Sequence, residues 1–358
     1  MIFDSVLEEI KRGQEGLNKG LPHGLSKLSQ FLPNVQQKTY YLIGASTGCG
    51  KTTLVDQMFM YEPFEYINNT PDCEFTLDID YFSFEIDKIT KITKGVSRQL
   101  FNKYKIVADV NYILSRGEHR VSQEIYDKVI ECREYFEKLE NSLTVFDMPE
   151  NPTGINKYLY RKAEKFGKVH RKQVEKLDEN GQIKKFEVFD RYEPYDKNRY
   201  HMVIIDHISL LPEERGYNTK QLIDKMSQYL VLLRNNFNII PVVVQQLNYD
   251  INDPMRAKTN RLTPMLSDFG DSKYTTRDAN YVLSLFSPMT FDIQNFAGYN
   301  VEKLKDRFRS LEILKGRDGG IGTRVGLGYL GESGVFKELP RADQMTDLQY
   351  DGLIKLGK

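Results

Sequence analysis

A glycine-rich turn at residues 44–53 constrains the fold of this chain more than any other feature of its sequence. The turn reads Gly-Ala-Ser-Thr-Gly-Cys-Gly-Lys-Thr-Thr. It follows a short β-rich apolar run at residues 39–43 and precedes residues 54–60, whose apolar positions have helical spacing. A strand, a turn ending in Gly-Lys-Thr and a helix, in this order, are typical of a phosphate-binding loop. A chance glycine-rich turn is the alternative, and the flanking strand and helix disfavour it.

The residue types in the turn suit a triphosphate. Small residues let successive backbone N–H groups converge on phosphate oxygens, and the start of the following helix adds a favourable partial positive charge. Lys51 is expected to reach the β- and γ-phosphates, and the Thr52 hydroxyl is expected to ligate Mg²⁺. The predicted nucleotide site comprises Ser46, Thr47, Gly48, Cys49, Gly50, Lys51, Thr52 and Thr53.

Composition and charge exclude several classes of protein. The 358 residues contain 50 Lys and Arg against 50 Asp and Glu, so the net charge is zero. A strongly basic protein that coats DNA is therefore disfavoured, and any nucleic-acid contact has to come from a local basic surface. No apolar run approaches the ~20 residues of a membrane span. The acidic N-terminus is not typical of a signal peptide, and three widely spaced cysteines indicate neither a zinc site nor a disulfide framework.

Short apolar runs alternate with helical patterns along most of the chain. This alternation predicts an α/β fold in which helices flank a mostly parallel sheet on both faces. The predicted strands are residues 39–43, 81–84, 143–147, 202–206, 239–246, 279–286 and 310–315, followed by a hairpin near 324–338. The predicted helices are residues 3–13, most of 86–142, 154–166 and about 218–236.

Polar side chains follow three of the predicted strands at the point where each strand ends. Glu85 follows residues 81–84, Asp206 follows four apolar residues, and Gln246 closes the strand that begins at residue 239. Ligands of open α/β sheets bind beyond the carboxyl ends of the strands. Asp206 is therefore expected to hold Mg²⁺, Glu85 to orient or deprotonate a water molecule, and Gln246 to contact the γ-phosphate. Each residue alone could be a turn residue or a helix cap.

Together with the glycine-rich turn, five further segments appear in the order of a known family. They are residues 82–85 (Phe-Ser-Phe-Glu), 204–211 (Ile-Ile-Asp-His-Ile-Ser-Leu-Leu), 246–248 (Gln-Leu-Asn), 264–268 (Pro-Met-Leu-Ser-Asp) and 315–319 (Lys-Gly-Arg-Asp-Gly). The chain resembles the motor domain of DnaB-type hexameric replicative DNA helicases, a branch of the RecA-like ATPases. The resemblance covers about residues 20–340, and the compact chain is similar to phage-encoded versions that lack the N-terminal domain.

The resemblance implies a shared active site and a set of partners. It implies that Glu85 is the catalytic base, Asp206 the second acidic motif and Gln246 the γ-phosphate sensor. It further implies that Lys315 and Arg317 act on the nucleotide of the next subunit, Arg317 as an arginine finger. The implied cofactors are ATP and Mg²⁺. The implied partners are single-stranded DNA, further copies of the chain in a homo-hexamer, and a primase or helicase loader. The implied location is the cytoplasm. For a phage-encoded chain, this is the cytoplasm of the bacterial host. For Lys315 and Arg317, a solvated strand end is the alternative.

Four basic residues are candidates for DNA contact in the loop region that follows the strand ending at Gln246. The sequence departs from the family pattern here, since Tyr249 replaces an arginine and residues 269–271 replace an expected basic position. Ordinary surface charge is therefore a balanced alternative for these residues. The candidates are Arg256, Lys258, Arg261 and Lys273.

An inserted β-hairpin is predicted at about residues 167–199. Asn180-Gly181 is a strong two-residue turn signal between alternating stretches. Residues 157–199 contain 13 Lys and Arg against 8 Asp and Glu, so the insertion is locally basic. A solvated decoration without a ligand is an equal alternative. The expected organisation is a linker helix and connector at residues 1–19, the ATPase domain at 20–340 and a tail at 341–358.

Three functions are compatible with these residues. The first is an ATP-dependent DNA helicase that translocates on single-stranded DNA. The second is a RecA-like DNA-dependent ATPase that does not unwind DNA, such as a recombination mediator. The third is an inactive or regulatory nucleotide-binding protein, which the presence of Lys51, Glu85 and Arg317 disfavours.

Overall fold

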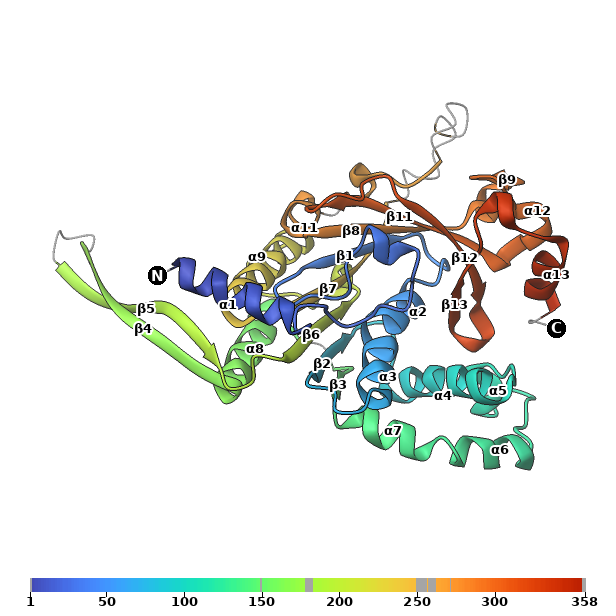
Figure 1. Ribbon diagram of the computed structural model, residues 1–358, viewed down its shortest axis with the longest axis horizontal. Coiled ribbons are helices and arrows are strands. Elements are labelled where there is room, and N and C mark those ends of the chain that lie inside the picture. Colours follow the sequence, from blue (N-terminus) through green and yellow to red (C-terminus); the bar gives the residue numbers. More distant parts are fainter. Residues whose placement is uncertain are drawn as a thin grey trace.

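The computed structural model describes residues 2–148, 150–177, 183–248, 256, 262–270 and 272–355. Within these residues, nine strands form one sheet in the order β13-β12-β11-β8-β1-β7-β6-β2-β3. Figure 1 shows the sheet at the centre of the molecule. The strands are β1 (Tyr41–Ala45), β2 (Thr76–Ser83), β3 (Leu143–Phe146), β6 (Arg199–Asp206), β7 (Ile240–Gln246), β8 (Tyr281–Phe286), β11 (Phe308–Gly316), β12 (Arg324–Leu330) and β13 (Val335–Glu338).

Six of the strands are parallel, as the alternating pattern predicts. β1 pairs in parallel with both β7 and β8, and β2 pairs in parallel with both β3 and β6. β11, β12 and β13 extend the sheet with antiparallel pairing. The carboxyl ends of the parallel strands therefore lie along one edge of the sheet, and the end of β11 lies along the other edge.

Helices cover both faces of the sheet (Figure 1). On one face, Tyr41 and Ile43 belong to a buried cluster with Leu54 of α2 and Leu100 of α4. On the other face, Leu42 belongs to a second buried cluster, to which α8 and α9 contribute. Successive side chains of a strand point to opposite faces, so the continuous apolar run of β1 supplies both cores.

The helices begin and end where the sequence offers caps. Asp87 accepts a hydrogen bond from the Thr90 N–H at 2.9 Å at the start of α4, and Asn218 and Gln221 form a reciprocal capping box at the start of α9. The helices are α1 (Ile2–Gln14), α2 (Lys51–Asp56), α3 (Glu62–Asn69), α4 (Lys88–Tyr104), α5 (Val110–Ile113), α6 (Gln123–Ile130), α7 (Arg133–Glu140), α8 (Pro152–Phe166), α9 (Thr219–Phe237), α11 (Lys273–Asp278), α12 (Val301–Leu304) and α13 (Asp347–Lys355). None of the helices in the described part of the chain combines the length and apolar character needed to cross a bilayer.

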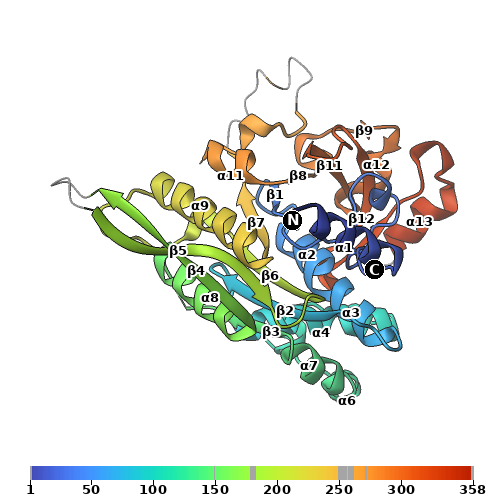
Figure 2. The same cartoon turned by 60° about the vertical axis from the view of Figure 1, so that its left-hand side comes forward.

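The predicted hairpin is confirmed as β4 (Gly167–Leu177) and β5 (Ile183–Pro194), which pair antiparallel along their whole length. Figures 1 and 2 both show it projecting from the body of the molecule. Its base is fixed by aromatic contacts, because Phe189 and Tyr192 meet the ring of Phe237 edge-on at 5.6 and 5.2 Å. The predicted turn at Asn180-Gly181 lies outside the described residues.

The two ends of the chain are helical. α1 bears exposed apolar side chains, and its Glu8 and Arg12 contact Lys197 and Asn198 at the base of the hairpin. In the segment that was expected to be a tail, α13 packs Tyr350 and Leu353 against α12. A small pair of strands, β9 (Asn295–Phe296) and β10 (Tyr299–Asn300), adjoins this C-terminal cluster.

Candidate active site

The glycine-rich turn connects the end of β1 to the start of α2. Gly48 and Gly50 have φ angles of 76° and 96°, and glycine adopts such left-handed conformations without the steric cost that other residues meet. Gly50 precedes the first residue of α2, and a π-helical turn (Gln57–Tyr61) joins α2 to α3. The backbone of the turn thus leads directly into a helix, as a phosphate-binding loop requires.

Lys51 lies buried at this junction and faces the two predicted acidic residues. Its ammonium group donates to the backbone carbonyl of Ser46 at 3.3 Å. Burial lowers the pKa of Lys51, while the negative charges of Glu85 and Asp206 act in the opposite direction. The structure therefore brings together three residues that are more than 30 positions apart in sequence.

Asp206 closes β6 and is 1% exposed. Its Oδ2 atom accepts a hydrogen bond from the Tyr81 hydroxyl at 3.0 Å. Its Oδ1 atom is buried and has no hydrogen-bond partner among the described residues. An unsatisfied buried carboxylate oxygen is costly, and hard oxygen ligands suit Mg²⁺. Asp206 and the Thr52 hydroxyl at the start of α2 are oxygen donors of the kind that Mg²⁺ prefers.

Glu85 lies next to Asp206 because β2 and β6 are neighbours. The backbone N–H of Phe84 donates to the carbonyl of Asp206 at 2.9 Å, and Glu85 follows directly. Unlike Asp206, Glu85 is exposed. An exposed carboxylate beside a buried one can accept a proton from a water molecule.

Gln246 closes β7 beside the end of β1, where it pairs in register with Ala45. Its side-chain amide donates to the Thr47 hydroxyl at 2.9 Å. The side chain at the end of one strand is therefore hydrogen-bonded to the glycine-rich turn that follows its neighbour. The predicted gathering of Lys51, Glu85 and Gln246 at one edge of the sheet is observed.

Lys315 and Arg317 lie at the opposite edge. Gly316 pairs with Tyr281, and Tyr281 pairs with Tyr41 at the start of β1. The Lys315 ammonium donates to the carbonyls of Thr276, Arg277 and Ala279 at the end of α11, at 2.8, 2.7 and 2.8 Å. Arg317 is exposed, and within the described residues its guanidinium has no hydrogen bond or ion pair.

The candidate DNA-contact residues are in different environments. Arg256 forms an ion pair with Asp268 at 2.6 Å and donates to the Thr263 carbonyl at 2.9 Å. Lys273 is exposed at the start of α11. Lys258 and Arg261 lie outside the described residues. Among the candidates that the structure describes, Lys273 is exposed, whereas Arg256 is bound to Asp268.

Arg309 contacts the glycine-rich turn and was not expected from the sequence. It is 2% exposed, and its Nε atom donates to the carbonyl of Cys49 at 3.0 Å. Its other nitrogen atoms bind Asp306, and its guanidinium lies 4.7 Å from the ring centre of Tyr329. Tyr329 stacks on Phe336 at 4.6 Å. Because β11 also contains Glu312 and Lys315, the sequence does not distinguish Arg309 from the other charged residues of this strand.

A buried ion pair between Lys91 and Asp56 lies next to Tyr81, the residue that donates to Asp206. The Lys91 ammonium is 2.5 Å from the Asp56 carboxylate and 3.6 Å from the ring centre of Tyr81. Burial lowers the pKa of Lys91 and raises the pKa of Asp56, and the attraction between the two charges opposes both shifts. Since the Tyr81 hydroxyl donates to Asp206, the Lys91–Asp56 pair packs against the side chain that is hydrogen-bonded to Asp206.

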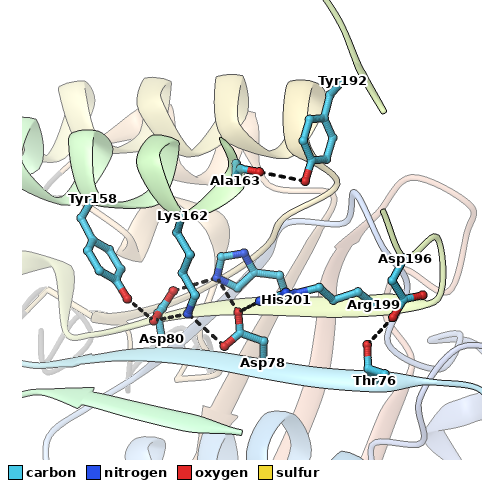
Figure 3. A network of polar contacts seen from close by, with 10 residues as sticks. All are labelled: Thr76, Asp78, Asp80, Tyr158, Lys162, Ala163, Tyr192, Asp196, Arg199 and His201. Atoms are coloured by element: carbon cyan, nitrogen blue, oxygen red, sulfur yellow. Dashed lines mark hydrogen bonds and ion pairs between the residues drawn. The ribbon is translucent and has the colours of Figure 1, made fainter. Parts of the chain in front are cut away.

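A third network lies at the amino end of β2, away from the nucleotide edge (Figure 3). Lys162 of α8 binds Asp78 and Asp80 at 2.9 and 2.7 Å, and His201 of β6 lies 2.7 Å from Asp80. Tyr158 also donates to Asp80 at 2.9 Å. Although two carboxylates and an imidazole can bind a metal, the Lys162 ammonium already supplies positive charge here. The network joins α8 and β6, the two elements that flank the hairpin.

Comparisons with known proteins agree with this geometry. A family model described as the DnaB-like helicase C terminal domain matches residues 153–338, which is more than half of the chain. The matched span contains Asp206, Gln246, Lys315 and Arg317, whereas the glycine-rich turn precedes it. A comparison with curated proteins found no match.

Two solved structures share the fold over 94% of this chain. The first is an ATPase domain, with a TM-score of 0.67, 17% sequence identity and 98% of that chain covered. The second is a DnaB-like replicative helicase described with its interactions with primase, with a TM-score of 0.66, 18% identity and 66% of that chain covered. The predicted RecA-like core with helices on both faces is confirmed.

Proposed function

The chain belongs to the family of DnaB-like helicases, and from this premise we propose that it is an ATP-dependent DNA helicase of the replicative hexameric type. It couples ATP hydrolysis at subunit interfaces to translocation on single-stranded DNA. The observation that carries this proposal is the division of the site between two edges of the sheet. Lys51, Glu85, Asp206 and Gln246 gather at one edge, and Arg317 extends from the other.

In the proposed mechanism, residues 46–53 bind the triphosphate through backbone N–H groups and the Lys51 ammonium. The Thr52 hydroxyl and the Asp206 carboxylate hold Mg²⁺, which when bound neutralises charge on the phosphates. Glu85 orients the attacking water and accepts its proton. The hydrogen bond of Gln246 to Thr47 makes the end of β7 sensitive to the occupant of the turn.

The second half of the site comes from a neighbouring copy of the chain. Arg317 places its guanidinium against the neighbour's γ-phosphate and stabilises the charge that develops during transfer. Lys315 supports this position through the end of α11, to which its ammonium is bound. A homo-hexamer satisfies this head-to-tail requirement with every site complete.

Single-stranded DNA is the proposed nucleic-acid partner, and a primase or a helicase loader is a proposed protein partner. Lys273, together with Arg256, Lys258 and Arg261, lies on the segments that follow β7 and contacts DNA phosphates. Six copies sum a small positive charge per chain into a continuous track. A DNA-dependent ATPase without unwinding activity is the second candidate, since it needs the same nucleotide site.

Strand displacement on a forked DNA duplex separates the two candidates. The wild-type chain with ATP and Mg²⁺ is expected to release the labelled strand, and Glu85→Gln is expected to bind ATP but to hydrolyse it at least 10²-fold more slowly. DNA-stimulated ATPase activity without strand release would favour the second candidate. Unchanged hydrolysis by Glu85→Gln would show that another group is the base.

A further inference from the structure

The hairpin β4–β5 has two chemically different faces beyond its base. Cross-strand partners share a face, and Arg171 and Phe189, which are partners, turn toward the body of the molecule. Arg171 binds Tyr160 and Glu164 of α8. We refer to the opposite face as the outer face of the hairpin. It carries Lys172, Val174, Lys184, Phe186 and Val188.

The outer face combines an apolar stripe with positive charge. Val174 pairs with Phe186, which is 45% exposed, and Val188 pairs with Lys172. Aside from Asp190 at the bulge, which binds Lys172 at 3.2 Å, the acidic residues of the two strands near the tip lie on the other face. Over both strands, seven Lys and Arg exceed four Asp and Glu by three. An exposed apolar stripe with a charged rim is typical of a protein interaction surface.

The hairpin leaves the body at the edge of the sheet that carries Arg317. β5 leads into β6, whose first residue Arg199 pairs with Thr76 at the start of β2. The amino ends of the parallel strands and the end of β11 share this edge. In the proposed assembly this edge faces a neighbouring copy, because Arg317 has to reach the neighbour's nucleotide. The hairpin therefore extends toward the same neighbour.

The opposite end of the molecule offers a complementary surface. Figure 1 shows the hairpin at one end of the long axis, with α5 and α6 toward the other. Residues 123–140, which span α6 and α7, contain six Asp and Glu against three Lys and Arg, a net charge of −3. This charge is opposite in sign to that of the hairpin, which is +3 over the two strands and +1 over residues 167–194 with the residues between the strands included. Tyr126 and Ile130, four residues apart on α6, are 51% and 46% exposed. Residues at this spacing lie on one side of a helix.

We propose that the hairpin is an intersubunit arm whose outer face docks on the α6–α7 surface of the neighbouring copy. This contact is heterologous, since two different surfaces meet, and it repeats around a ring. The inference rests on the proposed function, because it concerns the same assembly. A nucleic acid is the less favoured occupant, since the hairpin lies at the edge of the sheet away from the segments that follow β7.

Photo-cross-linking tests the contact directly. A benzophenone side chain replaces Phe186, and the chain is mixed with an equal amount of ¹⁵N-labelled chain, Mg²⁺, a non-hydrolysable ATP analogue and an oligo-dT strand. Cross-links from position 186 to residues 123–140 of the other copy are expected. Cross-links to the same copy, to another region of the neighbour or to the oligonucleotide would each overturn the proposal. The same label at Tyr195, which is 75% exposed at the base of the hairpin, is the control.

Charge reversal supplies an independent test with a built-in rescue. The double variant Lys172→Glu/Lys184→Glu is expected to raise the protein concentration at which half of the chains are assembled about tenfold. Adding Glu124→Lys and Asp127→Lys to the same chain is expected to return this concentration to the wild-type value. Lys185→Glu on the opposite face is the matched control and is expected to leave assembly unchanged. If the wild-type chain assembles and unwinds DNA, and the charge-reversal variants assemble equally well, the intersubunit arm is wrong and the proposed function is unaffected. A wild-type chain that never assembles overturns the proposed function as well.

Discussion

Arg317 and Lys51 lie at opposite ends of the same sheet. Gly316, which precedes Arg317, pairs with Tyr281, and Tyr281 pairs with Tyr41 at the start of β1. Lys51 instead follows the far end of β1. Since each residue of a strand advances the chain by about 3.3 Å, the length of β1 alone separates the two positions by more than ~10 Å. Arg317 therefore lies at the end of the sheet opposite the glycine-rich turn of its own chain.

Mixing two inactive variants tests this division. Lys51→Ala and Arg317→Ala are each expected to lower ATP turnover by about 10³-fold or more, because each removes charge from every phosphate site. In an equal mixture, random assembly makes about a quarter of the head-to-tail interfaces intact, so steady-state ATPase activity should partly return. Mixed assemblies that stay inactive, with their mass confirmed, would contradict an arginine supplied by the neighbour.

The hydrogen bond between Gln246 and Thr47 predicts a defect in coupling. Gln246→Ala removes the 2.9 Å contact to the turn but leaves Lys51, Asp206 and Glu85 in place. ATP binding is expected to persist, while stimulation of ATPase activity by single-stranded DNA is expected to be lost. The ratio of ATPase rates with and without oligo-dT measures this effect.

Gln245 provides the matched control for Gln246. Its side-chain amide oxygen Oε1 is buried and accepts a hydrogen bond from the Thr275 hydroxyl at 2.9 Å. Gln245→Ala is therefore expected to lower the free energy of unfolding by about 1–2 kcal/mol without uncoupling hydrolysis from DNA. The interpretation of Gln246 would be wrong if both variants lost DNA stimulation equally.

Much of the nucleotide edge can be predicted from local sequence. Residues 44–53 combine a turn that needs glycine with a strand before it and a helix after it. Glu85, Asp206 and Gln246 follow apolar runs, and the parallel topology alone brings their positions to one edge. The hairpin is equally local, because alternation and a turn signal encode it.

Tertiary contacts are the part that local sequence does not reveal. Arg309 meets the carbonyl of Cys49 across 260 positions of sequence, and no periodicity connects the two. Lys315 was expected at an open subunit edge, yet its ammonium is bound to the end of α11. Such pairings depend on how helices and strands pack, which spacing along the chain does not specify.

Arg309 predicts a link between stability and nucleotide affinity. Arg309→Met removes the donor to the Cys49 carbonyl and leaves buried acceptors unsatisfied. The free energy of unfolding is expected to fall by about 2–4 kcal/mol, and the KM for ATP to rise more than kcat falls, since the turn is held less firmly. Urea unfolding and steady-state kinetics measure the two effects. Arg324→Met, which breaks the partly exposed pair with Glu312, is the control and should cost less than about 1 kcal/mol.

The Asp80 network predicts acid sensitivity. Burial alone would raise the pKa of Asp80, but the hydrogen bond from His201 and the charges of His201 and Lys162 outweigh it, so the pKa lies below its ordinary value of about 3.9. The folded state thus binds the proton more weakly than the unfolded state. The stabilisation is fully present above about pH 4 and is lost as the pH falls through the lower, folded pKa.

Asp80→Asn removes this charge and tests the pH dependence. At neutral pH the variant is expected to lose about 1.5–3 kcal/mol of unfolding free energy, because Lys162 and His201 lose one of their two carboxylate partners and keep only Asp78. The difference between wild type and variant should shrink as the pH is lowered below about 4, because Asp80 is protonated first in the unfolded wild type and then, at lower pH, in the folded wild type. Urea unfolding at pH 7, 5, 4 and 3 measures both curves, and the exposed Asp343→Asn serves as the control. A constant difference across this range would show that the network stabilises the fold by packing, and the charge of Asp80 would then have no part in it.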